Sequence, residues 1–126
     1  MKTEIYSNNA PKPIGPYSQA IKHGNMIFIS GQIAMDYQNS NIINENIAEE
    51  TETVMKNIMS ILKESGCNFQ NIVKCSIFLS DMNLFDEVNK IYSKYFSHPF
   101  PARETVEVSK LPKNVNVEIS AIAITK

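Results

Sequence analysis

Three segments of the chain carry apolar side chains at both odd and even positions, and this limits the folds open to it. They are residues 26–29, 71–79 and 117–124, each of strand length. Successive side chains of a strand point to opposite faces of its sheet, so these segments are apolar on both faces. A sheet built from them needs cover on both sides.

Helical periodicity appears in two further segments. Residues 47–65 show one apolar stripe, and Gly66 marks their end. A second helix is predicted to begin with Ser80 or Asp81 as its cap and to end before Pro99 and Pro101. The stripe of this second helix consists of Leu84, Phe85, Val88, Ile91, Tyr92, Tyr95 and Phe96. Both stripes are interpreted as core.

The order of elements predicts the fold class. The predicted strands lie near residues 2–6, 17–22, 26–30, 71–79, 102–109 and 116–125. With the two helices, the order β-β-β-α-β-α-β-β predicts a single α+β domain over residues 1–126. It would have a mixed six-stranded sheet with both helices on one face. Residues 31–46 are expected to form a long loop.

Two helices cannot cover both faces of such a sheet. The remaining face needs a partner, and a second copy of the chain is the simplest one. We therefore predict a homo-oligomer whose sheets face inward.

Charge and composition argue against several classes of function. The net charge is −1, and the basic residues are scattered rather than clustered, so a nucleic acid is an unlikely main partner. The longest apolar run falls far short of the roughly 20 residues that span a bilayer. We expect a cytoplasmic protein without a membrane segment.

The cysteines and histidines indicate neither a metal nor a redox site. Cys67 and Cys75 lack a ligand or redox spacing, and His23 and His98 are far apart in the sequence. Cys75 is interpreted as a core residue, whereas Cys67, after Gly66, is expected to be exposed.

Arg103 is the only arginine among the 12 basic residues, and the others are lysines. Its planar guanidinium can bind a carboxylate or phosphate through two parallel hydrogen bonds, which an ammonium cannot do. It stands at the start of a predicted strand, which suggests a small anionic ligand. The alternative is a structural ion pair with an acidic residue, and the residue type alone does not decide between them.

Glu118 is the only carboxylate in the apolar run 117–124. An ionised carboxylate in a buried strand is costly unless it has a partner or reaches water. It could pair with Arg103 or a lysine, or it could line a small polar cavity and polarise a water molecule.

Motifs along the whole chain resemble the reactive intermediate deaminase family, the RidA/YjgF group. The matching segments are Asn9-Ala10-Pro11, Ile14-Gly15-Pro16-Tyr17-Ser18-Gln19-Ala20, Ser30-Gly31-Gln32-Ile33, Asp81-Met82-Asn83-Leu84-Phe85, Val88-Asn89, Phe100-Pro101-Ala102-Arg103, Leu111-Pro112-Lys113 and Val117-Glu118-Ile119. Each is weak alone, but together they are strong.

The resemblance implies a chorismate-mutase-like fold, a homotrimer and clefts between its subunits. It also implies hydrolysis of 2-imino acids and their enamine tautomers, such as 2-aminoacrylate, to 2-keto acids and ammonia. Small 2-imino and 2-keto acids would be the ligands, and neither a cofactor nor a metal would be needed.

The resemblance also assigns roles to individual residues. Arg103 would bind the substrate carboxylate, and Glu118 would position the attacking water and transfer protons. Tyr17, Ser30 and Gly31 would line the cleft. Asn89 would have a supporting role. Taken singly, Tyr17 could merely pack at an interface, Ser30 could end a strand and Gly31 could serve a turn.

Thr105 departs from the family pattern, because many relatives carry cysteine two residues after the arginine. No thiol nucleophile is therefore expected there. Thr105 could still offer its hydroxyl or backbone carbonyl to the water.

Two other functions remain open on sequence grounds. A keto-acid-sensing or protein-binding module would use Arg103 equally well, but an adjacent Glu118 would oppose simple anion binding. An endoribonuclease or translation inhibitor is disfavoured by the near-neutral charge.

Overall fold

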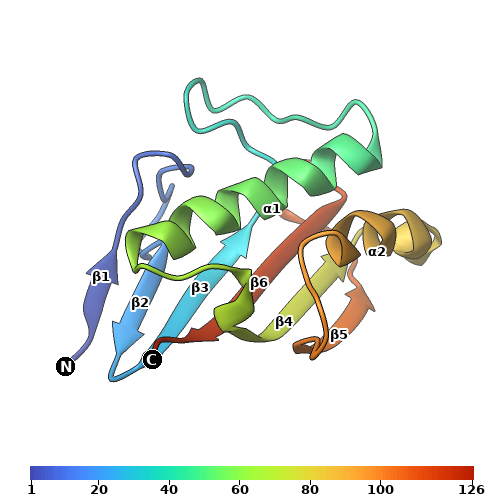
Figure 1. The fold of residues 1–126 in the computed structure, drawn as a ribbon. Coiled ribbons are helices and arrows are strands. Elements are labelled where there is room, and N and C mark those ends of the chain that lie inside the picture. The colour runs from blue at the N-terminus through green and yellow to red at the C-terminus, as the bar shows by residue number, and fades with distance from the viewer.

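The computed structural model describes all residues 1–126, and its six strands form one mixed sheet covered on one face by two helices (Figure 1). The sheet order is β1-β2-β3-β6-β4-β5. The elements are β1 (Thr3–Ile5), β2 (Ala20–His23), β3 (Met26–Gln32), α1 (Ile47–Glu64), β4 (Ile72–Leu79), α2 (Phe85–Ser93), β5 (Ala102–Glu107) and β6 (Val117–Ile124). The predicted α+β class, element order and one-sided helix layer are confirmed.

All neighbouring strands are antiparallel except β4 and β5, which run parallel. A parallel pair needs a crossover connection, and α2 supplies it. The helix that leads into β5 therefore lies on the same face as α1 (Figure 1).

The core lies between the helices and the sheet. Alternate residues of β6 are buried, and α1 contributes a buried stripe against them. The central buried side chains include Ile27, Ile58, Leu62, Ile77, Leu79, Ile119 and Ala123.

The opposite face of the sheet carries exposed apolar side chains. Met26, Phe28, Val73 and Val106 are each exposed by 37–44%. Strands apolar on both faces were predicted, and the structure confirms this pattern.

Three details differ from the prediction. Asp81 does accept a hydrogen bond, from the Asn83 backbone N–H at 2.9 Å, but it caps a short 3₁₀ turn, and α2 begins only at Phe85. Helix α2 ends at Ser93, so Tyr95 and Phe96 follow it and pack against Phe69 instead.

Cys67 is buried rather than exposed, which corrects a second expectation. Gly66 takes a positive φ of 72° and turns the chain back over the end of α1. The Cys67 backbone N–H then donates to the Leu62 carbonyl at 2.9 Å. Third, β3 continues to Gln32, two residues into the segment predicted as loop.

Candidate functional site

Glu118 lies on the face of the sheet that the helices leave uncovered. It pairs in register with Phe78 of β4, whereas its neighbours Val117 and Ile119 point into the core. Its carboxylate is half-buried and makes no hydrogen bond or ion pair within the chain. The proposed pairing of Glu118 with Arg103 or a lysine is therefore absent. Burial raises the pKa of Glu118 above its ordinary value.

Gly31 creates the space that the Glu118 carboxylate occupies. A Cβ atom built on Gly31 would overlap the carboxylate of Glu118. The register between β3 and β6 also shifts between Ile29 and Gln32, at Ser30 and Gly31. Such irregularities in a strand re-aim neighbouring groups. Here the missing side chain lets the carboxylate lie against the backbone of β3.

A pocket of about 400 Å³ opens beside Glu118. Four of the residues assigned to the site on sequence grounds line it together: Tyr17, Ser30, Gly31 and Glu118. Half of Tyr17 is exposed, so its ring is accessible from the pocket mouth. The Ser30 hydroxyl donates to the Ser18 carbonyl at 2.6 Å, which ties the Tyr17 loop to β3.

Gln19 and Lys12 belong to this region and were not predicted. Gln19 is buried and its side-chain amide donates to the carbonyls of Ser7, Ala10 and Pro11, so it shapes the loop that precedes Tyr17. Lys12 brings the pocket's only basic side chain. The signal for Gln19 was its place beside Tyr17 in the N-terminal motif.

Glu50 fixes the start of β6, next to Glu118. This carboxylate of α1 is fully buried, and it accepts from the Asn116 backbone N–H at 2.7 Å and the Val117 backbone N–H at 3.1 Å. The Asn116 side-chain amide donates to its other oxygen at 2.9 Å. Nothing in the sequence indicated that Glu50 is buried or that it meets these donors.

Arg103 lies on the other face of the sheet, under α2. It pairs in register with Cys75 of β4, whose side chain is buried in the core. One guanidinium nitrogen, Nη1, donates to the Asn89 side-chain oxygen at 2.7 Å. No carboxylate lies within ion-pair distance of Arg103, so the structural ion pair considered above is absent. Asn89, to which the resemblance gave only a supporting role, therefore contacts Arg103 directly.

Two aromatic rings flank the guanidinium. The Arg103 Cζ atom lies 5.6 Å from the Phe85 ring centroid and 5.0 Å from the Tyr92 ring centroid. Both distances fall within the range of cation–π interactions. Phe85 and Tyr92 had been interpreted only as core, because apolar periodicity cannot distinguish a ring that packs on the core from one that also contacts a cation.

Thr105 follows Arg103 on the same face of β5. Its hydroxyl is buried and lacks a hydrogen-bond partner, as does the hydroxyl of Tyr92. A second pocket, of about 430 Å³, opens beside Arg103 and is also lined by Asn89, Tyr92 and Phe100. Burial raises the pKa of Tyr92, so its hydroxyl stays neutral.

The predicted site residues therefore form two groups within one chain. Tyr17, Ser30, Gly31 and Glu118 belong to the uncovered face, whereas Asn89, Arg103 and Thr105 belong to the helix-covered face. The three-residue step from Cys75, which pairs with Arg103, to Phe78, which pairs with Glu118, puts the two charged groups on opposite faces. A single chain cannot bring them together.

The chain shows neither a metal-binding cluster nor a membrane-spanning helix. No three side chains of His, Cys, Asp or Glu come together in a cluster that could hold a metal ion. Neither helix is both long enough and apolar enough to cross a membrane.

Comparison with known proteins relates this geometry to one family. The family model described as Endoribonuclease L-PSP matches residues 7–125. The human protein named 2-iminobutanoate/2-iminopropanoate deaminase is 46% identical over 120 residues, covering 95% of this chain and 88% of the human one.

Solved structures share the fold over nearly the whole chain. The Rid-family protein YyfA of Yersinia pestis superimposes with a TM-score of 0.96 at 43% identity, over 99% of this chain and 100% of its own. TdcF of E. coli, solved with bound serine, superimposes with a TM-score of 0.93 at 33% identity, over 98% and 99% of the two chains.

Proposed function

Since the chain belongs to the Endoribonuclease L-PSP family, the RidA/YjgF group, we propose that it hydrolyses small 2-imino acids to 2-keto acids and ammonia. The substrates would be species such as 2-iminopropanoate, its enamine tautomer 2-aminoacrylate, and 2-iminobutanoate. The human relative of this chain is named for two of these compounds.

The observation that carries the proposal is the unpaired guanidinium of Arg103. It has no carboxylate partner in the chain, and its one side-chain hydrogen bond goes to the neutral oxygen of Asn89. The remaining N–H groups of the guanidinium can bind a substrate carboxylate through two parallel hydrogen bonds, the geometry that arginine favours. Serine, which is bound in the TdcF structure, is likewise a small molecule with a carboxylate.

The division of the site between two faces supports a complete site made from two copies of the chain. The uncovered face has apolar side chains that a second copy would bury, and Glu118 lies on that face. We propose a homotrimer in which the Glu118 pocket of one subunit adjoins the Arg103 pocket of the next. The clefts between subunits would then contain both charged groups.

Glu118 would position the attacking water and transfer protons in this cleft. Water attacks C2 of the protonated imine, and its proton passes to the Glu118 carboxylate. Glu118 returns that proton to the amino group of the tetrahedral intermediate. Ammonia then leaves as the C2 hydroxyl becomes a carbonyl and gives its proton to Glu118. A pKa raised by burial makes Glu118 a better proton acceptor for these steps.

The remaining residues would complete the cleft. Tyr17, Ser30 and Gly31 would line the side that holds the water, while Asn89 would orient Arg103. The Thr105 hydroxyl has unused hydrogen-bonding capacity close to Arg103. No step needs a thiol, because the carbon of a protonated imine is already electrophilic.

The two alternatives explain less of the geometry. A keto-acid sensor needs Arg103, but it has no use for a half-buried carboxylate in the adjoining pocket. A ribonuclease site needs several cations for phosphates, whereas the two pockets hold one basic residue each, Lys12 and Arg103.

The proposal can be tested by trapping the imine. A serine dehydratase generates 2-aminoacrylate in situ, and semicarbazide competes with the purified protein for the imine form. The protein is expected to suppress formation of the semicarbazone of the imine while pyruvate accumulates. Trapping at the same rate with and without the protein would overturn the proposed activity.

Arg103→Lys tests the carboxylate clamp in the same assay. The charge is kept but the fork is lost, and one charge-assisted hydrogen bond contributes about 1.5–3 kcal/mol. We expect kcat/KM to fall by about 10- to 100-fold with the oligomeric state unchanged. Full activity in this variant would refute the clamp.

A further inference from the structure

We infer that Phe85 and Tyr92 of α2 are positioning residues that hold the Arg103 guanidinium in the orientation in which it receives a carboxylate. This inference deepens the function proposed above and rests on it. Neither residue needs to touch the substrate for this role.

The first support is the spacing of the residues around the guanidinium. Phe85, Asn89 and Tyr92 are separated by four and three positions, so they lie on one face of α2. All three contact the guanidinium: the two rings at 5.6 and 5.0 Å from Cζ, and the Asn89 oxygen at 2.7 Å from Nη1. One stripe of α2 thus supplies the hydrogen bond and both aromatic contacts of the Arg103 guanidinium.

The second support is the cost of ordering a long side chain. Arginine has several rotatable bonds and loses rotamer entropy when its side chain is fixed. The rings of Phe85 and Tyr92 limit the movement of the guanidinium toward α2. The hydrogen bond to Asn89 fixes the direction of the Nη1 group. Much of this ordering is then complete before a ligand binds, which strengthens binding without a new contact to the ligand.

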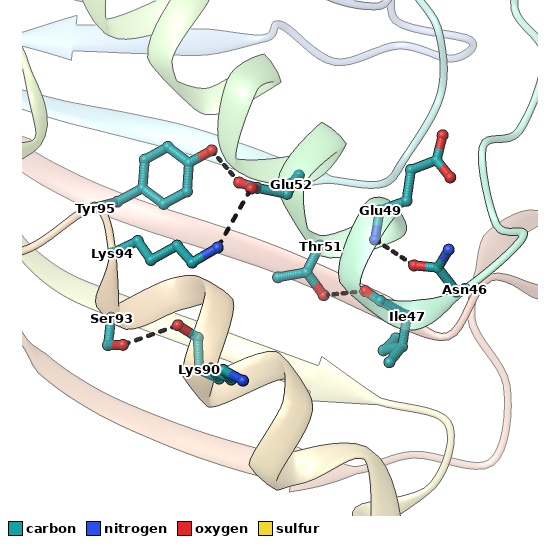
Figure 2. A network of polar contacts seen from close by, with 9 residues as sticks. All are labelled: Asn46, Ile47, Glu49, Thr51, Glu52, Lys90, Ser93, Lys94 and Tyr95. Carbon is teal, nitrogen blue, oxygen red and sulfur yellow. Dashed lines mark hydrogen bonds and ion pairs between the residues drawn. The ribbon is translucent and has the colours of Figure 1, made fainter.

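The third support is that α2 is itself held firmly. Glu52 of α1 accepts a hydrogen bond from the Tyr95 hydroxyl and lies 3.9 Å from the Lys94 ammonium, just beyond the end of α2 (Figure 2). Val88, Ile91 and Tyr92 are buried under the helix. The face that contacts Arg103 is therefore anchored through both its core residues and its C-terminal end.

Tyr92 positions Arg103 through its aromatic ring, not through its hydroxyl. Its hydroxyl is buried without a hydrogen-bond partner, which in itself does not favour folding. A phenylalanine in its place would keep the contact with Arg103. The conservative variant Tyr92→Phe therefore distinguishes the ring from the hydroxyl.

The experiment uses the fact that Arg103 is the only arginine in the chain. Its side-chain Nε–H gives a single ¹⁵N resonance, so the order of the guanidinium can be measured by relaxation on the assembled protein. Tyr92→Leu and Phe85→Leu are expected to lower this order and to raise KM for the imine about 3- to 30-fold, with kcat nearly unchanged. Tyr92→Phe is expected to restore both properties relative to Tyr92→Leu.

Tyr95→Leu is the matched control. It also removes a tyrosine side chain, two residues beyond the end of α2. The Tyr95 ring packs on Phe69 and its hydroxyl donates to Glu52, and neither contacts Arg103. This substitution should lower the thermal midpoint. Because the buried residues Val88, Ile91 and Tyr92 still hold α2 in place, the order of Arg103 and KM should stay as in the wild type. If Tyr92→Leu and Phe85→Leu behave like this control, the positioning inference is wrong.

Two failures can be told apart in these data. If the wild type hydrolyses imines but ring removal changes neither order nor KM, only the positioning inference fails. If the wild type neither hydrolyses imines nor binds pyruvate, the proposed function fails and the inference falls with it. Should Tyr92→Leu not fold, Phe85→Leu decides alone, because Phe85 is only partly buried.

Discussion

Glu50 and Glu118 are two carboxylates beside the same strand, β6, and their surroundings differ sharply. Glu50 reaches the strand from α1, is fully buried and accepts three hydrogen bonds from Asn116 and Val117. Glu118 projects from the uncovered face, is half-buried and accepts none. The comparison shows that the Glu50 carboxylate is fully used in holding the strand, whereas the Glu118 carboxylate keeps its hydrogen-bonding capacity for the proposed role.

The largest effect is expected from Glu118→Gln, which keeps the shape of the side chain and removes its basicity. General acid–base catalysis contributes typically ~10²–10⁴-fold, so kcat should fall by that range while pyruvate binding persists. Titration calorimetry with pyruvate and the imine-trapping assay measure the two properties. Unchanged turnover would remove Glu118 from the chemistry and abolish the contrast with Glu50.

Gly31→Ala sharpens the comparison by moving Glu118 without altering its chemistry. The new methyl group would overlap the carboxylate, which must shift. Misplacement of a catalytic group by about 1 Å can cost ~10²-fold, so we expect kcat to drop to that extent. A crystal structure of the variant would show the displaced side chain.

Gly24→Ala is the control for this substitution. Gly24 has a φ of 60° in the hairpin turn and no atom near its missing Cβ. Its replacement should cost about 1 kcal/mol of stability through backbone strain alone, with normal activity. Equal activity of the Gly31 and Gly24 variants would contradict the account of Gly31.

Glu50→Ala is expected to act on stability instead. The substitution leaves three hydrogen-bond donors without an acceptor. An unsatisfied buried donor costs about 1–3 kcal/mol, so the free energy of unfolding should fall by about 3 kcal/mol or more. Glu50→Gln keeps one acceptor oxygen and should lose less. Urea unfolding followed by circular dichroism measures both. A Glu50→Ala variant as stable as the wild type would show that these hydrogen bonds contribute little.

The smallest effect concerns the pH dependence of stability. The raised pKa of Glu118 means that its protonated form is favoured in the folded state. The contribution of protonated Glu118 to folding stability is complete below its ordinary pKa of 4.5. That contribution is lost as pH rises through the raised pKa of the folded state. As pH rises from 4.5 through the raised pKa of Glu118, the free energy of unfolding of the wild type should therefore fall relative to that of Glu118→Gln.

Glu104→Gln provides the opposite sign in the same titration. Hydrogen bonds from Ser76 and Lys74 lower the pKa of Glu104, so its stabilising form is the ionised one. The contribution of ionised Glu104 to folding stability is present above its ordinary pKa of 4.5. That contribution is lost as pH falls through the lowered pKa of the folded state. Urea midpoints from pH 3 to 8 compare the two variants, and slopes of the same sign would refute one of the assignments.

The sequence predicted most of the fold because its apolar periodicity was strong. Helix α1 was expected over 47–65 and runs from Ile47 to Glu64. The boundaries of α2 were wrong, because aromatic residues beyond Ser93 continue the helical spacing while packing from a turn. Hydrophobic spacing records which side chains are buried, not the backbone conformation that buries them.

The sequence singled out candidate site residues but did not reveal their geometry. Arg103 and Glu118 stood out as a lone arginine and a lone carboxylate, yet nothing in the spacing showed that they face opposite ways. That fact depends on the register of β4 with both its neighbours. The contacts of Glu50 with β6 were hidden for the same reason, since they join residues 66 and 67 positions apart.

The parallel pairing of β4 and β5 has a consequence for how this protein can vary. Because the crossover delivers α2 and β5 together, the arginine and its supporting side chains fall within residues 85–105, one uninterrupted stretch of sequence. Glu118 and Tyr17 lie outside that stretch. A short exchange between relatives can thus alter the proposed carboxylate-binding half while leaving the proposed hydrolytic half unchanged, so the two halves can diverge separately.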